Sequence, residues 1–252
     1  MSPPMSPAVS PPVPSALIRL WDRPPLAIDH RPGTGDGMVL SFASVGHDPA
    51  RPPAPEFLRS ATAGGRAALF ISDASRSWAN APDWPEALAT ARDRTGRGPG
   101  TRLLALGVSM GGFSALAAGT VLPLAAILAI GPQYSVNPAL MPDETRWRDW
   151  TARITDWRFP VAPLPEGPWI VLMHGLADDA RQARAFPERP GVDHILFPGI
   201  PHSDLAAHLK ARGVLAGLIE AALQDDRRRL LRITSGAGGV LRRRTPALLQ
   251  PD

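Results

Sequence analysis

The chain has 252 residues, of which 44% are apolar and 20% are charged, and it contains no cysteine. This length suits one sizeable hydrophobic core, and the apolar content is too high for a disordered chain. Without cysteine there can be no disulfide scaffold, no thiolate metal site and no cysteine nucleophile. The formal net charge is +4.

That charge is carried by the last part of the chain. Residues 225–252 hold seven arginines and three aspartates, which leaves the first 224 residues with 20 basic and 20 acidic side chains. A neutral body does not indicate a nucleic-acid partner, and we expect none. We interpret 225–252 as an Arg-rich surface tail with a helical stretch at 225–232 and, as an alternative role, contact with an acidic surface.

Residues 1–16 are rich in proline and serine, with six prolines among the first fourteen residues. They have neither a basic start nor an apolar stretch, so they do not resemble a secretory signal. We predict a disordered arm here, partly in the polyproline conformation. Together with the absence of cysteine, this favours a cytoplasmic location.

The body alternates predicted strands and helices, which indicates an α/β fold with a mainly parallel sheet and right-handed crossovers. The predicted helices are 83–95, 111–119 and 203–223, and the predicted strands are 17–21, 26–30, 38–43, 67–72, 103–106, 124–130, 168–173 and 192–197. Residues 132–167 fit no such unit. We interpret them as a cap insertion, which either covers a substrate or packs a small core of its own with Tyr134, Trp147, Trp150, Trp157 and Phe159.

No charged residue occurs between Leu103 and Pro142. A membrane span needs about 20 predominantly apolar residues, but glycines, Ser109 and Pro123 divide this stretch into short segments. We therefore expect buried strands and a buried helix here, and no integral membrane segment.

One motif carries chemistry. Gly107-Val108-Ser109-Met110-Gly111 has the pattern G-x-S-x-G, with an apolar strand before it and an Ala-rich helix after it. In this setting the serine projects from a sharp, strained turn, and strand and helix approach so closely that the glycine positions cannot carry a Cβ. The N–H groups at the start of the helix then point at negative charge that develops beside Ser109.

Over about residues 17–224 the chain resembles the α/β-hydrolase family. The resemblance implies a three-layer α/β/α domain in which Ser109 is the nucleophile, followed in sequence by an acid and a histidine. The acid loop His-Gly-Leu-Ala-Asp-Asp (174–179) suggests Asp178, with Asp179 as its rival. The loop Phe-Pro-Gly-Ile-Pro-His-Ser (197–203) suggests His202.

The same resemblance implies an oxyanion hole formed by the backbone N–H groups of Met110 and Ser44. The segment around Ser44 reads Phe-Ala-Ser-Val-Gly and departs from the family's His-Gly pattern, which leaves the second donor open. Ile-Ser-Asp (71–73) resembles a strand end whose aspartate is structural.

Several of these residues also have a structural interpretation. Asp178 is also a favourable helix N-cap, and Ser109 is also a plain turn residue. His174 ends a strand beside the acid loop and more often braces such a loop; the other histidines are His30, His47, His194 and His208. Gly33-x-Gly35-x-Gly37 precedes a strand, so a turn is favoured over a dinucleotide site.

The resemblance implies a serine hydrolase that cleaves a small ester or thioester through an acyl-enzyme, without a metal or an organic cofactor. Acyl transfer to another acceptor on the same fold is one alternative. A binding protein that keeps the fold without turnover is another, because fold alone does not establish function.

Overall fold

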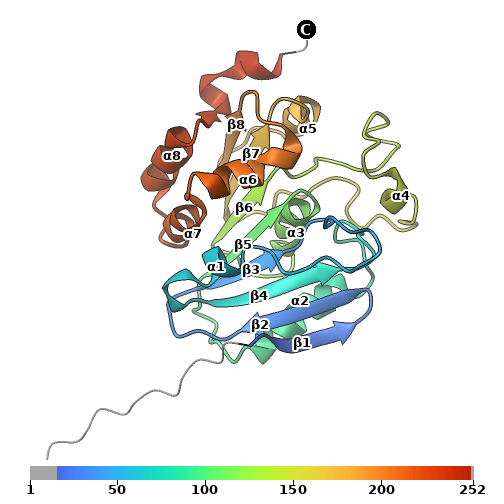
Figure 1. Ribbon diagram of the computed structural model, residues 1–252, viewed down its shortest axis with the longest axis vertical. Coiled ribbons are helices and arrows are strands. Elements are labelled where there is room, and N and C mark those ends of the chain that lie inside the picture. Colours follow the sequence, from blue (N-terminus) through green and yellow to red (C-terminus); the bar gives the residue numbers. More distant parts are fainter. Residues whose placement is uncertain (1–15, 251–252) are drawn as a thin grey trace, which may run out of the picture.

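The computed structural model describes residues 16–250, so the predicted arm at 1–16 lies almost entirely outside the described residues. One nine-stranded sheet runs through the molecule in the order β1-β2-β4-β3-β5-β6-β7-β8-β9 (Figure 1). Its strands are β1 (Ile18–Arg23), β2 (Leu26–Arg31), β3 (Met38–Phe42), β4 (Ala67–Asp73), β5 (Leu103–Val108), β6 (Ala126–Ile130), β7 (Trp169–Gly175), β8 (Val192–Phe197) and β9 (Val240–Leu241).

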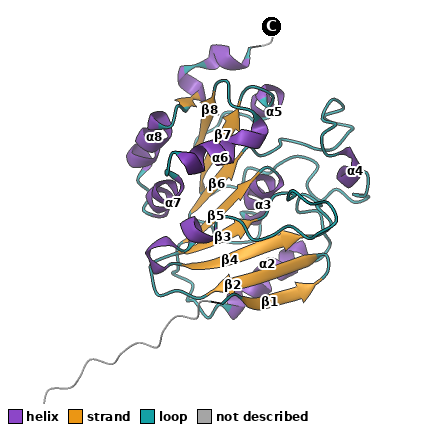
Figure 2. Cartoon of the chain, in the orientation of Figure 1, coloured by secondary structure: helices purple, strands orange, loops and turns teal. Residues whose placement is uncertain are grey.

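The six strands from β4 to β8 in this order are parallel, whereas β1, β2 and β9 run antiparallel to their neighbours. The helices are α1 (Leu58–Ala61), α2 (Trp84–Arg94), α3 (Met110–Ala118), α4 (Arg148–Thr151), α5 (Ala180–Ala185), α6 (Leu205–Ala211), α7 (Leu215–Leu223) and α8 (Arg227–Gly236). Figure 2 shows helices on both faces of the sheet, which confirms the predicted three-layer arrangement.

Alternating side chains of each strand point to opposite faces of the sheet, where they belong to two separate hydrophobic cores. Leu40 and Phe42 of β3 pack in one core with Leu88 of α2 and Phe113 of α3. The opposite face of the sheet carries Val39, Phe70, Leu104 and Leu106, which pack under α6, α7 and α8. Because the central strands are covered on both faces, they are apolar on both faces, which explains the charge-free stretch.

The predicted helix 203–223 is divided into a short 3₁₀ turn at His202–Asp204, α6 and α7. The break between α6 and α7 falls at Gly213, whose φ is +68°. Glycine adopts this left-handed conformation without the steric cost of a Cβ, so the chain turns here and both helices keep an apolar face on the sheet.

The structure builds the predicted tail, residues 225–252, into the fold as far as residue 250. Leu230 of α8 is fully buried, and β9 extends the sheet by pairing with β8. The Arg227 guanidinium lies 2.6 Å from both carboxylate oxygens of the buried Asp193. Arginines that form a charge run in the sequence thus pair with acidic groups of the body. The expected helical stretch at 225–232 overlaps α8, and among the described residues the predicted surface tail also contains a strand of the sheet.

Candidate active site

Ser109 occupies a sharp bend between β5 and α3. Its backbone angles are φ 55° and ψ −122°, a strained conformation for a residue with a side chain. Its N–H donates to the Ile130 carbonyl at the end of β6, with a distance of 2.8 Å. A Cβ on Gly107 would lie 2.1 Å from the Gly111 carbonyl oxygen, and one on Gly111 would lie 2.2 Å from that of Phe42. The glycines of the motif are therefore needed for close approach, as the sequence predicts.

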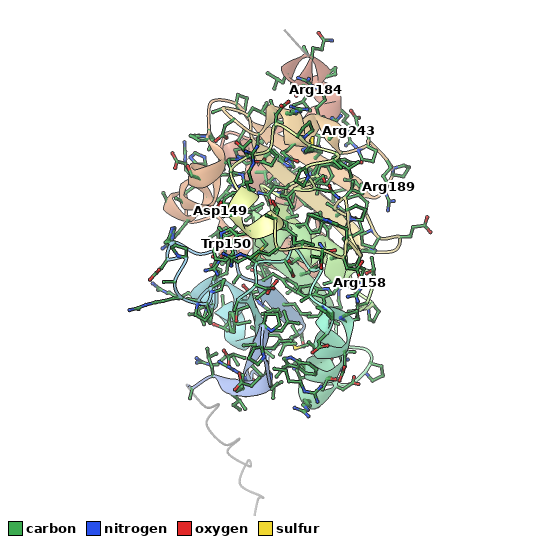
Figure 3. All side chains as sticks on the ribbon, turned by 90° about the vertical axis from the view of Figure 1, so that its right-hand side faces the viewer. Asp149, Trp150, Arg158, Arg184, Arg189 and Arg243 are labelled. Carbon is green, nitrogen blue, oxygen red and sulfur yellow. The ribbon has the colours of Figure 1, made fainter. Side chains whose placement is uncertain are left out.

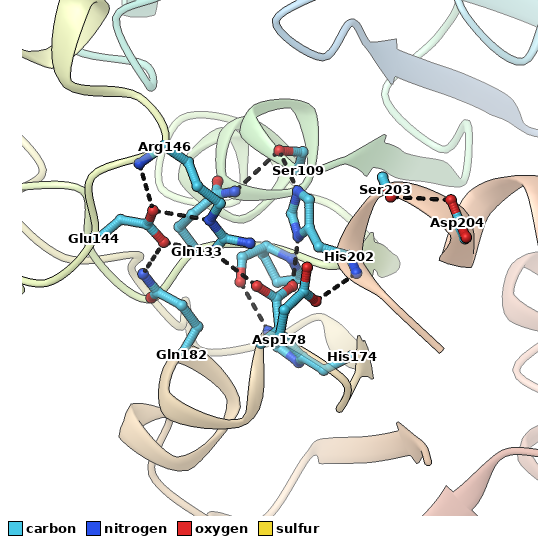
Figure 4. Close-up of polar contacts among 12 residues, drawn as sticks. Ser109, Gln133, Glu144, Arg146, His174, Asp178, Gln182, His202, Ser203 and Asp204 are labelled. Atoms are coloured by element: carbon cyan, nitrogen blue, oxygen red, sulfur yellow. Dashed lines mark hydrogen bonds and ion pairs between the residues drawn. The ribbon is translucent and has the colours of Figure 1, made fainter. Parts of the chain in front are cut away.

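His202 lies in the loop between β8 and α6, and its Nε2 is 3.0 Å from the Ser109 Oγ. Figure 4 shows the two side chains facing each other across the carboxyl ends of the strands. Ser109 and His202 are 5% and 8% exposed. The structure thus brings together two side chains that are 93 positions apart in the sequence.

The acid that contacts the His202 ring is Asp179, with 2.5 Å between its Oδ2 and Nδ1. Asp178 instead accepts a hydrogen bond from the His202 backbone N–H at 2.6 Å. The structure corrects the predicted choice between these neighbours. Asp179 directly precedes α5 and is 1% exposed, whereas Asp178 lies one residue earlier in the turn, on its solvent side. Adjacent residues of such a turn project in different directions, and the motif offset does not fix which one faces the ring.

The second oxygen of Asp179 is held by the insertion. Arg146 Nη2 donates to Asp179 Oδ1 at 2.8 Å and to Glu144 Oε2 at 2.5 Å. Gln182 of α5 in turn donates to Glu144. Burial alone would raise the pKa of Asp179, but the hydrogen bond and the charge interaction with His202, with a smaller contribution from Arg146, hold this pKa below its ordinary value. Asp179 is therefore an anion at neutral pH. Sequence reasoning missed Arg146, which belongs to no motif.

Gln133, in the loop after β6, is a second residue that sequence reasoning missed. Its Nε2 lies 3.0 Å from the Ser109 Oγ, and it is 1% exposed. Nothing in the local sequence distinguishes it from other loop residues. Its position is recognised only when the loop is seen next to the Ser109 bend (Figure 4).

The two predicted oxyanion donors differ in availability. Met110 is the first residue of α3, and its N–H points out of the helix start without an acceptor among the described residues. The Ser44 N–H is already donated to Glu56 Oε1 at 3.2 Å, and the Ser44 hydroxyl donates to the same oxygen at 2.6 Å. Ser44 therefore does not offer the predicted free donor.

Comparison of the sequence alone was uninformative, because no protein-family model and no curated protein matched it. Comparison of the structure gave clear matches. A capsule O-acetyltransferase of Neisseria meningitidis serogroup A has a TM-score of 0.55 at 13% identity, covering 79% of this chain and 94% of that one. Thermogutta terrifontis esterase 2 has a TM-score of 0.51 at 15% identity, covering 84% and 97% of the two chains. An S-formylglutathione hydrolase of Staphylococcus aureus has a TM-score of 0.50 at 13% identity, covering 85% and 99%.

The chain has the α/β-hydrolase fold. Serine hydrolases and esterases are among its structural neighbours over about 80% of its length. At these identities the likeness shows the fold alone, and the chemistry has to be argued from the residues of the site.

On this α/β-hydrolase fold, the insertion between β6 and β7 covers the Ser109–His202 pair. The Trp147 ring lies 6.0 Å from the His202 ring and 6.1 Å from that of Trp78, measured between centroids. Figure 3 looks onto this side, with Asp149 and Trp150 of α4 in front. The Arg76 guanidinium stacks 4.1 Å from the Trp150 ring. The insertion aromatics therefore pack onto the main domain, and they form no separate core among the described residues.

His174 braces the loop that carries Gln133. Arg242 can only donate, so the His194 Nδ1, 3.2 Å away, is an acceptor and the His194 Nε2 carries the proton. This N–H donates to the His174 Nδ1 at 2.8 Å, and the His174 Nε2–H donates to the Pro132 carbonyl at 2.8 Å. Both rings are thus neutral with fixed tautomers. Burial lowers the pKa of His174 to about 4 and lowers the pKa of His194 well below its ordinary value.

The remaining candidates of the sequence are structural or distant. Asp73 at the end of β4 accepts hydrogen bonds from the backbone and hydroxyl groups of Ser75 and Ser77, as expected for a structural aspartate. Within residues 16–250 no group of three or more His, Asp or Glu side chains is arranged to hold a metal ion. In the same range no helix is both long and apolar enough to cross a membrane.

The neutral histidine pair predicts a pH dependence of stability. In the unfolded chain His174 binds a proton below about pH 6.5, whereas the folded protein keeps it neutral down to about pH 4. Between these values the unfolded state binds more protons, so stability falls as the pH falls. The expected loss approaches about 3 kcal/mol for His174. Urea unfolding at several pH values measures it. The free energy of unfolding should depend less steeply on pH in His174→Gln. The dependence should persist in His47→Gln, which changes an exposed histidine.

Proposed function

We propose that the protein is a serine hydrolase that cleaves a small ester or thioester through an acyl-enzyme on Ser109. The observation that carries this proposal is the unbroken hydrogen-bond chain from the Ser109 Oγ through the His202 ring to Asp179. It lies beside the N-terminus of α3, where backbone N–H groups favour negative charge. A serine, a base and an orienting acid in this geometry are the parts that acyl transfer requires.

In the first half-reaction, the Ser109 Oγ attacks the carbonyl carbon while its proton moves to the His202 Nε2. The electron pair of the C=O bond moves to the oxygen, which becomes an oxyanion. Asp179 stabilises the imidazolium and holds the ring with Nδ1–H toward itself. Collapse of the intermediate re-forms the C=O bond and breaks the bond to the leaving alcohol or thiol, which takes the proton from His202.

In the second half-reaction, water replaces the leaving group. The water oxygen attacks the acyl carbon while His202 removes a proton from the water, and a second tetrahedral intermediate forms. Its collapse breaks the bond to Ser109, and His202 returns a proton to the Oγ. The Met110 N–H stabilises the oxyanion in both halves of the reaction.

The surroundings of Ser109 support a substrate with an apolar acyl part. The Trp147 ring lies between the rings of Trp78 and His202, with centroids 6.1 and 6.0 Å away, so aromatic surface lies next to the base. The indole N–H of Trp147 is buried and has no acceptor among the described residues, so it offers a donor to a bound polar group. The neighbours named as an esterase and as an S-formylglutathione hydrolase are consistent with small esters or thioesters. A cytoplasmic location stays a prediction from the sequence.

Labelling with a fluorophosphonate tests the proposal. This reagent phosphonylates a serine only when the serine is activated as a nucleophile. We expect labelling of the wild-type protein and its loss in Ser109→Ala, with Ser114→Ala, a buried serine of the following helix α3, as the control. A folded wild-type protein that is neither labelled nor able to cleave esters would instead be a binding protein on this fold.

The two adjacent aspartates should respond differently to removal of charge. Asp179→Asn should lower kcat for p-nitrophenyl acetate by about 10³–10⁴-fold, because the amide no longer favours the ring tautomer that accepts the Ser109 proton. Asp178→Asn retains an acceptor oxygen for the His202 backbone N–H and should lower kcat far less. Steady-state kinetics at pH 8 compares them. Equal losses would contradict the assignment of Asp179 as the orienting acid.

Acyl transfer to another acceptor is the second candidate function. Ser109 is only 5% exposed beneath the insertion, and this burial limits the access of bulk water to an acyl-enzyme. Product analysis in the presence of an added alcohol distinguishes the two functions. A transferase forms the new ester at alcohol concentrations far below that of water, whereas a hydrolase releases mainly the acid.

A further inference from the structure

The amide of Gln133 has one possible orientation. The Trp78 indole N–H can only donate, and it lies 2.9 Å from the Gln133 Oε1, so this atom is the carbonyl oxygen. The NH₂ group therefore faces Ser109, 3.0 Å from its Oγ. Gln133 and Trp78 are 1% and 0% exposed, so both hydrogen bonds are shielded from bulk solvent. The donor is fixed before a substrate arrives.

The segment that holds Trp78 is strained and tightly bonded. Arg76, Trp78 and Ala79 all have left-handed backbone angles, with φ of 53°, 50° and 63°. The Asp73 carboxylate at the end of β4 and the Asn80 side chain, which donates to two carbonyls of this segment, fix the turn. Non-glycine residues persist in this conformation only where their surroundings enforce it, and they cluster at functional sites. The indole is thus aimed at Gln133 by the fold.

The oxyanion site lacks the donor that the sequence predicts at Ser44. The Ser44 N–H points at Glu56, and burial raises the pKa of this carboxyl group. The other oxygen of Glu56 is buried without a hydrogen-bond partner. Of the two backbone donors expected, only the Met110 N–H is unpaired among the described residues. A second donor is needed close to the Ser109 Oγ.

We propose that Gln133 is a catalytic residue whose side-chain amide is the second oxyanion donor, with Trp78 as its positioning residue. The inference rests on the proposed function. In the tetrahedral intermediate, Oγ and the oxyanion are bonded to the same carbon, so a donor within reach of one is close to the other. The Nε2 carries two hydrogens, of which one faces the Ser109 Oγ and the other has no acceptor among the described residues. Gln133 keeps both hydrogens throughout, and the Ser109 proton still moves to His202.

The test compares an ester with its thiono analogue, in which sulfur replaces the carbonyl oxygen. Sulfur accepts hydrogen bonds weakly, so a donor to the oxyanion favours the oxygen ester. We expect Gln133→Leu to lower kcat for p-nitrophenyl acetate by about 10²–10³-fold with little change in KM. The ratio of kcat/KM for the oxygen ester to that for the thiono ester should fall by about tenfold. A residue that only supports the fold would lower both rates equally.

Two further variants complete the test. Trp78→Phe removes the indole N–H and leaves Gln133 in place, so it should lower the same ratio even if Gln133→Leu does not fold. Trp21→Phe is the matched control for Trp78→Phe, because Trp21 is also buried but lies on β1, and its indole N–H has no hydrogen-bond partner among the described residues. It should leave the ratio unchanged whatever it does to stability.

The outcomes separate the two proposals. If the wild-type protein neither reacts with the fluorophosphonate nor cleaves esters, the proposed function fails, and the role of Gln133 fails with it. If the wild-type protein is active and both Gln133→Leu and Trp78→Phe keep its oxygen-to-thiono ratio, only the role of Gln133 is overturned.

Discussion

The close approach of two backbone segments, at Gly107 and Gly111, determines the geometry of the site. The end of β5 and the first turn of α3 lie so near each other, and so near β3, that neither position accommodates a Cβ. Ser109 between them is forced into a left-handed conformation and projects from the bend. The same bend starts α3 at Met110, directly after Ser109, and the Met110 N–H has no acceptor among the described residues. Geometry and electrostatics of the site thus come from one packing constraint.

Around this bend, each polar group is held from two sides. The His202 ring lies between Ser109 and Asp179, Asp179 between His202 and Arg146, and the Gln133 amide between Ser109 and Trp78. A side chain with one partner keeps rotational freedom, whereas one with two partners is fixed in orientation. Arg146 comes from the insertion and Trp78 from the loop after β4. The insertion is therefore part of the site as well as its cover.

The sequence was sufficient for strands β1 to β8 and the Ser109 bend, because each rests on a local pattern, and the family resemblance pointed to His202, whose ring lies 3.0 Å from the Ser109 Oγ. An apolar run predicts a buried strand, and G-x-S-x-G between a strand and a helix predicts the bend. The sequence was insufficient to choose between Asp178 and Asp179, because that choice depends on which of the two side chains the turn before α5 directs toward the His202 ring. Gln133, Arg146 and the loss of Ser44 to Glu56 depend on contacts between distant segments. No local pattern records such contacts.

The pairing of β9 with β8 has a consequence for the order of assembly. Arg242, directly after β9, is bonded to the His194 ring and to the carbonyls of Ala183 and Phe186, and through the histidine pair it is connected to the Pro132 carbonyl. A ribosome makes residues 240–242 after all eight other strands of the sheet. The support beneath the loop of Gln133 is therefore completed last, so the nascent chain acquires its full set of site contacts only after synthesis of the domain is essentially finished.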